Sequence, residues 1–75
     1  MKPKHELNNQ LKLHRLKVGD MTQEDLAKAI GVTRQTILSI EKGRYTPSVA
    51  LALRMARVLG VQVEDLFKLK EDDHG

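Results

Sequence analysis

Apolar residues recur every three or four positions through most of this chain, and single glycines interrupt the pattern. Such spacing places apolar side chains along one face of a helix. A threonine or serine before an apolar run is typical of a helix start, and a glycine after it is typical of a helix end. No stretch alternates apolar and polar residues as a half-buried strand does. We therefore predict five helices and no strand, over residues 9–18, 23–30, 34–42, 49–59 and 64–68.

The second and third predicted helices are joined by only three residues. Gly31 ends one helix and Thr33 caps the next. So short a connection makes the two helices cross steeply instead of lying antiparallel, which is the helix-turn-helix arrangement. Leu26 and Ile30 form the buried stripe of the first of these helices, and the small Ala27 lets the two axes approach.

The third predicted helix has a core face and a polar face. At about 100° per residue, Ile37 and Ile40 point to the core. The other side presents two cations, an amide, a hydroxyl and an apolar tip, in Arg34, Lys42, Gln35, Ser39 and Leu38. In a major groove, arginine matches guanine, glutamine matches adenine and an apolar tip matches the thymine methyl group. An ordinary solvated face is the alternative, since arginine and glutamine are common on such faces.

Several neighbouring groups suit phosphate. The backbone amides at the starts of helices 23–30 and 34–42 carry partial positive charge. Segment 42–45 adds two cations and a phenol beyond the third helix, which favours contact with a DNA backbone. The alternative is a solvated loop in which Tyr45 packs over Pro47, and the two interpretations are compatible.

Charge is distributed unevenly along the 75 residues. The net charge is +3, yet 11 of the 13 lysines and arginines precede residue 61, whereas half of the ten acidic residues follow it. A basic body suggests an anionic partner such as nucleic acid. The length corresponds to one small domain. Without a signal-peptide pattern or a long apolar run, we expect the chain to act in the cytoplasm and not at a membrane.

Catalysis has little support in the sequence. The absence of cysteine excludes disulfides, zinc–thiolate sites and thiol nucleophiles. No glycine-rich phosphate loop, metal-ligand spacing or nucleophile–base pattern is present. A loose metal site at His5 and Glu6, or at residues 72–74, is less favoured than a solvated tail. We therefore predict no enzyme activity, no catalytic residue, no cofactor and no metal.

The stretch from Thr22 to Ser48 resembles the Cro/Xre class of lambda-repressor-like helix-turn-helix proteins. It contains the patterns T-Q-x-x-L-A-x-x-x-G-V, T-R-Q-T-I and I-E-x-G-x-x-x-P-S, and the likeness extends over about 9–69. The resemblance implies an all-α, five-helix domain over 9–69, after a flexible segment 1–8 and before an acidic tail 70–75. It also implies a regulator, by default a repressor, that binds double-stranded DNA sequence-specifically as a homodimer on a palindromic operator.

The resemblance further implies roles for individual residues. The helix that begins at Arg34 would enter the major groove. The side chains assigned to base reading are Arg34, Gln35, Ser39, Thr33 and Leu38. Those assigned to the DNA backbone are Thr22, Gln23, Thr36, Lys42, Arg44 and Tyr45.

The sequence departs from the family pattern at two places. The family often pairs an arginine late in the first helix with the glutamate of I-E-x-G, here Arg15 with Glu41. Because the linker 18–21 is one residue longer than the commonest form, whether this pair forms stays open. Gln62 also replaces the usual serine or threonine at the start of the last helix, which weakens that cap.

Two apolar stripes run along the helix 49–59. We assign Val49, Ala52, Leu53, Ala56 and Leu59 to the core. The second stripe and the apolar residues after it are predicted to form a two-fold dimer interface, made of Leu51, Met55, Val58, Val61, Val63, Leu66, Phe67 and Leu69. The alternative is that Leu66 and Phe67 cap the core of a monomer.

Two other functions are compatible with the sequence. The first is an antitoxin that binds DNA and uses residues 61–75 to engage a toxin. The second is an adaptor that bridges a transcription factor and the transcription machinery. An adaptor would tolerate changes on the face of the third helix, whereas Arg34, Gln35 and the phosphate-side Arg44 favour DNA binding.

Overall fold

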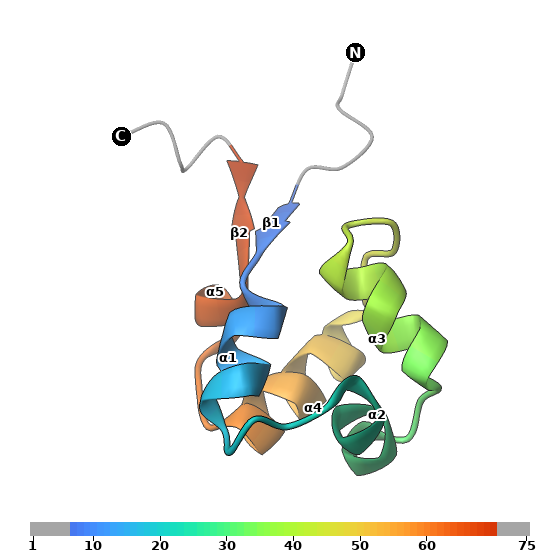
Figure 1. The fold of residues 1–75 in the computed structure, drawn as a ribbon. Coiled ribbons are helices and arrows are strands. Elements are labelled where there is room, and N and C mark those ends of the chain that lie inside the picture. Colours follow the sequence, from blue (N-terminus) through green and yellow to red (C-terminus); the bar gives the residue numbers. More distant parts are fainter. Residues whose placement is uncertain (1–6, 71–75) are drawn as a thin grey trace.

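The computed structural model describes residues 7–70, which form five helices and a two-stranded sheet (Figure 1). The two strands lie side by side at one end of the domain. Within residues 7–70, no helix combines the length and hydrophobicity that crossing a bilayer requires. In chain order, the elements are β1 (Leu7–Asn9), α1 (Leu11–Lys17), α2 (Gln23–Ile30), α3 (Arg34–Glu41), α4 (Val49–Leu59), α5 (Val63–Leu66) and β2 (Phe67–Leu69).

The three central helices begin and end where their caps predict. At the start of α2, the Asp25 amide donates to Thr22 Oγ1 at 3.0 Å, and the Thr22 amide donates to Asp25 Oδ2 at 3.1 Å. This reciprocal capping box lowers the pKa of Asp25, chiefly through the backbone N–H of Thr22. Gly31 ends α2 with a φ of 78°, a left-handed conformation that favours glycine. Thr33 and Ser48 also cap their helices, each by accepting one backbone amide, so the predicted threonine and serine caps are confirmed.

The sheet is the feature that the all-α prediction missed. Strand β1 pairs antiparallel with β2, with Leu7 opposite Leu69 and Asn9 opposite Phe67. The predicted first helix therefore loses residues 9 and 10, and the predicted last helix loses residues 67 and 68. Three-residue strands are too short to show alternation, and their pairing joins positions about 60 residues apart. Residues 7 and 8, which the prediction placed in the segment before the domain, lie in β1.

The core lies between the helices, and its six largest fully buried side chains are all apolar. They are Leu11, Leu26, Ile37, Ile40, Met55 and Leu66. Helix α4 lies at the back in the view of Figure 1, with α2 and α3 on one side of it and α1 and α5 on the other. The predicted core faces of α2 and α3 are confirmed, because Leu26, Ala27 and Ile30 are buried together with Ile37 and Ile40.

The prediction for α4 was wrong in part. Val49 and Leu53 were assigned to the core, but they are 77% and 55% exposed. Leu51 and Met55 were assigned to a dimer interface, but they are buried in the core. The two apolar stripes are adjacent on α4, so periodicity alone could not show which one faces α2 and α3.

The other residues of the predicted dimer interface differ in their burial. Leu66 is fully buried, so it caps the core, as the monomer alternative proposed. Val58 is half-buried beside Ile30 and Lys28 of α2, on another side of α4 from Leu53. Of the predicted interface, Val61, Val63 and Phe67 are half-buried and Leu69 is exposed.

Candidate nucleic-acid interface

The turn between α2 and α3 is built from backbone hydrogen bonds to one carbonyl. The amides of Gly31 and Val32 both donate to the Ala27 oxygen, at 2.9 and 3.0 Å. Ala27 is itself buried, so no larger side chain holds the two helices apart. As a result, α3 leaves α2 through a tight turn and runs along the outside of the molecule (Figure 1).

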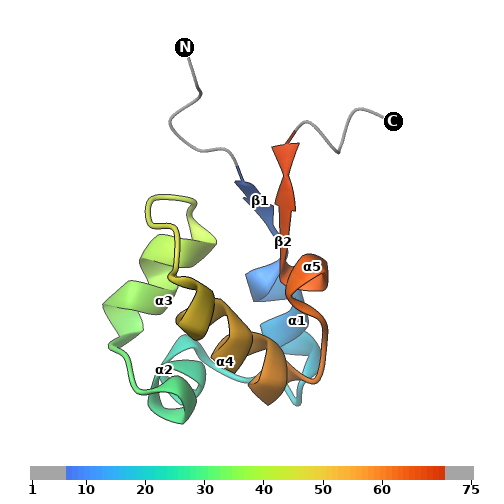
Figure 2. The ribbon, with the colours of Figure 1, turned by 180° about the vertical axis from the view of Figure 1, so that it is seen from behind.

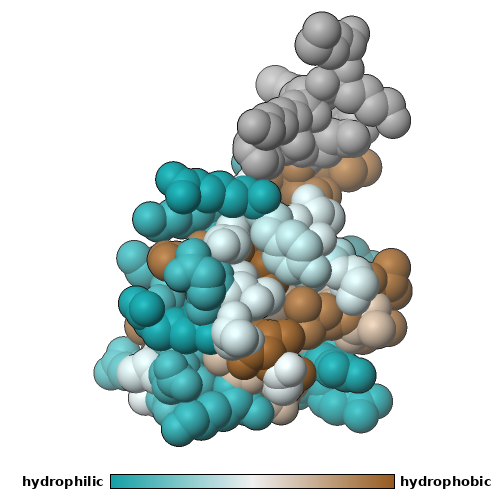
Figure 3. Space-filling model, turned by 90° about the vertical axis from the view of Figure 1, so that its right-hand side faces the viewer, coloured by the Kyte–Doolittle hydropathy of each residue, from teal (hydrophilic) through white to brown (hydrophobic). Residues whose placement is uncertain are grey.

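The outward side of α3 carries the predicted base-reading residues. Thr33, Arg34 and Gln35 are exposed at its start, whereas Leu38 and Ser39 are half-buried one turn later. Figure 3 looks onto this side of the molecule, where hydrophilic and neutral residues cover most of the surface and hydrophobic residues gather toward the right-hand edge. The first turn of α3 therefore offers a guanidinium and an amide to a neighbouring molecule.

A structured loop follows α3. The Gly43 amide donates to the Ile40 oxygen at 2.9 Å, and the Arg44 amide donates to the Ser39 oxygen at 2.9 Å. These bonds hold Lys42, Arg44 and Tyr45 just beyond the helix end, and all three are exposed. Tyr45 and Pro47 line the same small hollow beside Ile40, which agrees with the packing alternative for Tyr45.

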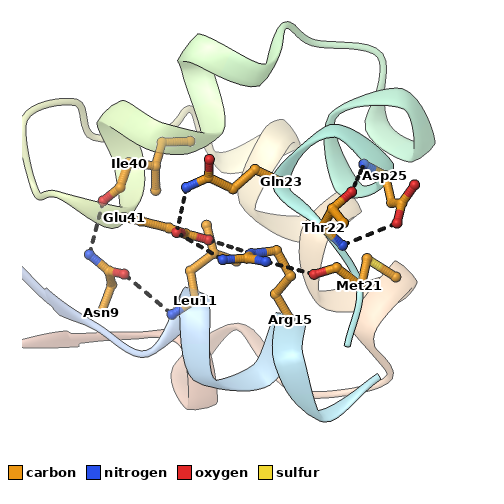
Figure 4. A network of polar contacts seen from close by, with 9 residues as sticks. All are labelled: Asn9, Leu11, Arg15, Met21, Thr22, Gln23, Asp25, Ile40 and Glu41. Carbon is orange, nitrogen blue, oxygen red and sulfur yellow. Dashed lines mark hydrogen bonds and ion pairs between the residues drawn. The ribbon is translucent and has the colours of Figure 1, made fainter. Parts of the chain in front are cut away.

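A buried ion pair joins α1 to the end of α3 (Figure 4). Arg15 Nε donates to Glu41 Oε2 at 2.7 Å and Arg15 Nη2 to Glu41 Oε1 at 3.3 Å. The two side chains are only 7% and 6% exposed. Arg15 Nη1 also donates to the Met21 carbonyl at 2.6 Å, so the guanidinium fastens the α1–α2 linker as well.

The long α1–α2 linker had left the Arg15–Glu41 pair undecided in the sequence analysis. Two of its residues adopt the left-handed backbone conformation. Gly19 and Asp20 have φ values of 58° and 55°, and the Asp20 amide donates to the Leu16 oxygen at 3.1 Å. Aspartate tolerates this conformation better than most residues. The extra residue is absorbed in this turn, and Arg15 keeps the register that it needs to reach Glu41.

Gln23 belongs to the same network. Its Nε2 donates to Glu41 Oε1 at 3.0 Å, and the side chain is half-buried at the start of α2 (Figure 4). An amide nitrogen carries two hydrogens, so Gln23 can bond to Glu41 and still donate to another acceptor. Its predicted phosphate contact therefore stays a prediction. Thr22, exposed at the same helix start, uses its hydroxyl oxygen in the capping box. Thr36 is half-buried, and its hydroxyl lies 3.0 Å from that of Thr33.

Asn9 is a site residue that the sequence analysis missed. Its Nδ2 donates to the Ile40 carbonyl at 3.0 Å, and its Oδ1 accepts from the Leu11 amide at 3.3 Å (Figure 4). One side chain on β1 thus joins the start of α1 to the end of α3. An asparagine just before a helix is a capping signal, but the bond to Ile40 spans 31 positions and leaves no local pattern.

Among residues 7–70, no group of three or more histidine, aspartate or glutamate side chains is placed to hold a metal. The loose metal candidates at positions 5–6 and 72–74 lie outside the described residues.

Comparison with known proteins gives consistent relatives. A helix-turn-helix family model matches residues 12–66. An uncharacterized HTH-type transcriptional regulator of Methanocaldococcus jannaschii is 49% identical over 67 residues, which cover 89% of this chain and all of that protein. The cryptic-phage CTXphi transcriptional repressor of Vibrio cholerae is 36% identical over 52 residues, covering 69% of this chain and 47% of the repressor.

A solved structure agrees with these relatives. The hypothetical transcription factor NHTF from Neisseria superposes with a TM-score of 0.70 at 27% identity, covering 83% of this chain and 70% of that one. The sequence matches, the fold and the α2–α3 turn therefore all indicate the same family. The chain belongs to the Cro/Xre-type helix-turn-helix family of DNA-binding transcription regulators.

Proposed function

We propose that this chain is a sequence-specific repressor that binds a palindromic operator in double-stranded DNA as a homodimer. The observation that carries this proposal is the exposed first turn of α3, which presents Arg34 and Gln35. The opposite end of the same helix is held in place by bonds to Ile40 and Glu41. Base reading needs donors that are free on the surface and a helix that is fixed beneath them.

Base contacts are assigned along one side of α3. Arg34 and Gln35 lie at the helix start, the part of a recognition helix that meets base edges. Ser39 and Leu38 lie about one turn further, where a hydroxyl and an apolar tip extend the reading to a neighbouring base pair. Thr33, exposed at the N-cap, lies where the wall of the groove would be.

Backbone contacts are assigned to the two flanks of α3. On one flank is the start of α2, with Thr22, the free donor of Gln23 and the partial positive charge of the helix end. On the other flank, Lys42, Arg44 and Tyr45 are exposed just past the end of α3. Phosphate contacts on both sides of a recognition helix fix its register on the duplex without reading sequence.

The homodimer and the palindrome are linked by symmetry. Two copies related by a two-fold axis present two α3 helices about one helical turn of DNA apart, so each reads one half-site. Repression then follows from occupation of a promoter, and the name of the Vibrio cholerae relative supports this direction of control. Binding to DNA inside the cell agrees with the cytoplasmic expectation.

Selection from a random duplex pool at about 150 mM salt tests the function. We expect a motif with two symmetric half-sites. A motif without symmetry would contradict the dimer but keep sequence-specific binding. Failure to select any motif, with weak binding to all duplexes, would contradict the proposal and favour the adaptor function. Arg54→Ala, which removes an exposed arginine of α4, is the control and should select the same motif as wild type.

A further inference from the structure

An apolar hollow of about 680 Å³ is lined by residues of α4, α5 and β2. In Figure 2, α4 lies in front, with α5 and β2 beside it. The floor of the hollow contains the small side chains of Ala52 and Ala56, which are buried. Val63 and Phe67 form the wall on the side of α5 and β2, and both are half-buried. We call this hollow, with the exposed α4 side chains at its rim, the α4–α5 groove.

Two large apolar side chains stand at the rim of the α4–α5 groove. Val49 is 77% exposed and Leu53 is 55% exposed, and both line the hollow. Clustered exposed apolar groups on so small a domain mark a surface that another molecule covers. The surface is also self-complementary, because the projecting Leu53 of one copy can fill the hollow above the alanines of another copy.

The charges in the groove favour a second copy of this chain as the occupant. Arg57 of α4 and Glu64 of α5 line the same hollow, and both are exposed. Because a two-fold axis sets the same surface of both copies against each other, a second copy can offer its glutamate to this arginine and its arginine to this glutamate. A partner of a single charge would satisfy one of these groups and repel the other.

We propose that the α4–α5 groove binds a second copy of this chain, with Leu53 inserted between Ala52 and Ala56 of the partner copy and Arg57 paired with its glutamate. This inference rests on the proposed function and names the surface that makes the dimer. It keeps Val61, Val63 and Phe67 of the interface predicted from sequence, because all three line the hollow. It leaves out Leu51, Met55 and Leu66, which are buried in the core.

The position of the groove agrees with a DNA-bound dimer. Figure 3 looks onto the side that carries α3, and Figure 2 looks onto the adjacent side, where α4 lies in front. A two-fold axis that runs along the groove surface and points toward the DNA therefore leaves both α3 helices on the same side of the dimer. A surface opposite α3 would not allow this with so short a chain.

Sedimentation equilibrium of two leucine variants tests the groove. Leu53→Glu places a charge in the proposed contact and should raise the dimer dissociation constant by about 100-fold or more. Leu13→Glu is the matched control, because Leu13 is 48% exposed on α1 and does not line the groove. It should stay within about threefold of wild type. Equal effects of the two substitutions, or a monomeric wild type at about 100 µM, would overturn the proposal.

Charge reversal tests the pairing. Arg57→Glu and Glu64→Arg should each weaken the dimer by about tenfold or more, and the double reversal should restore it. Arg54→Glu makes the same change of charge on α4 outside the groove and should leave the dimer unchanged. A double variant no better than the single variants would overturn the proposed pairs.

The proposed groove and the proposed function can each fail without the other. Monomeric Leu53→Glu should keep the circular dichroism of wild type and the same half-site preference at high concentration. A symmetric motif bound by a Leu53→Glu protein that is still dimeric would overturn the groove and keep the function. A protein that dimerises through the groove but selects no DNA motif would keep the groove and contradict the proposed function.

Discussion

Glu41 is the residue on which the geometry of the site most depends. Its carboxylate accepts from Nε and Nη2 of Arg15 and from Nε2 of Gln23, so it connects α1, the start of α2 and the end of α3. Because both ionised side chains are almost fully buried, neither can exchange its partner for water. Removal of one charge leaves the other unpaired in the interior.

Glu41→Gln should therefore lower the free energy of unfolding by about 3–5 kcal/mol, as for other buried pairs that lose one charge. Urea unfolding measures this change. The double variant Arg15→Met with Glu41→Leu removes both charges and should recover most of the loss. A Glu41→Gln protein within about 0.5 kcal/mol of wild type would show that the pair contributes little.

Asp25 makes stability depend on pH. Its pKa is lowered, first by the backbone N–H of Thr22 and then by the Thr22 hydroxyl, so the ionised form is favoured in the folded state. This contribution is present above the ordinary carboxyl range and is lost as pH falls through the folded-state pKa. Wild type should thus be more stable than Asp25→Asn near neutral pH, and the difference should shrink in acid.

Urea titrations between about pH 2 and pH 7 measure that difference. Glu24→Gln removes a second acid from the first turn of α2 and leaves the capping box intact, so it serves as the control. A gap between wild type and Asp25→Asn that is constant with pH would contradict the assignment.

At the scale of elements, local signals were sufficient for α2, α3 and α4. A capping threonine or serine, a helical run and a stop within a few residues all lie in one short stretch, so each could be identified from its own sequence. Local signals were not sufficient at the two ends of the domain. The pairing of β1 with β2 and the bond from Asn9 to Ile40 depend on residues far apart in sequence, which periodicity does not report.

The face of α4 was mispredicted for a related reason. Leu51, Leu53 and Met55 are all apolar, and only the arrangement of α2 and α3 decides which of them is covered. The candidate DNA-facing residues were easier to predict, because α3 has two buried isoleucines that fix its orientation.

Asn9 links two elements, and its removal should loosen the end of α3. Asn9→Asp keeps an acceptor for the Leu11 amide but loses the donor to the Ile40 carbonyl, so it isolates the second bond. We expect faster hydrogen exchange at the amides of Gly43 and Arg44, which lie just past that carbonyl.

Gln10→Ala is the control for this experiment, because Gln10 is exposed and its side chain makes no cap bond to α1. Unchanged exchange in Asn9→Asp would mean that the backbone bonds of the α3 end suffice without the asparagine.

At the scale of the whole molecule, the excess of cations before residue 61 implies binding that weakens with salt. The contribution of each cation should depend on the face that it occupies. Arg44 lies beyond the end of α3 and Arg54 lies on α4, although both are exposed and carry the same charge.

Arg44→Ala should weaken binding to all duplexes alike and should reduce the slope of log K against log salt by about one. Arg54→Ala should change the slope much less. Fluorescence anisotropy over a range of salt concentrations measures both slopes. Equal slope changes would mean that the DNA backbone is not contacted at the α3 end.

Base reading by the first turn of α3 is tested by the affinity of Arg34→Ala for a selected operator and for a scrambled duplex of equal composition. We predict a loss of about 1–3 kcal/mol on the operator and almost none on the scrambled duplex. Equal losses on both duplexes would make Arg34 a backbone contact. No loss on either would contradict base reading by this helix.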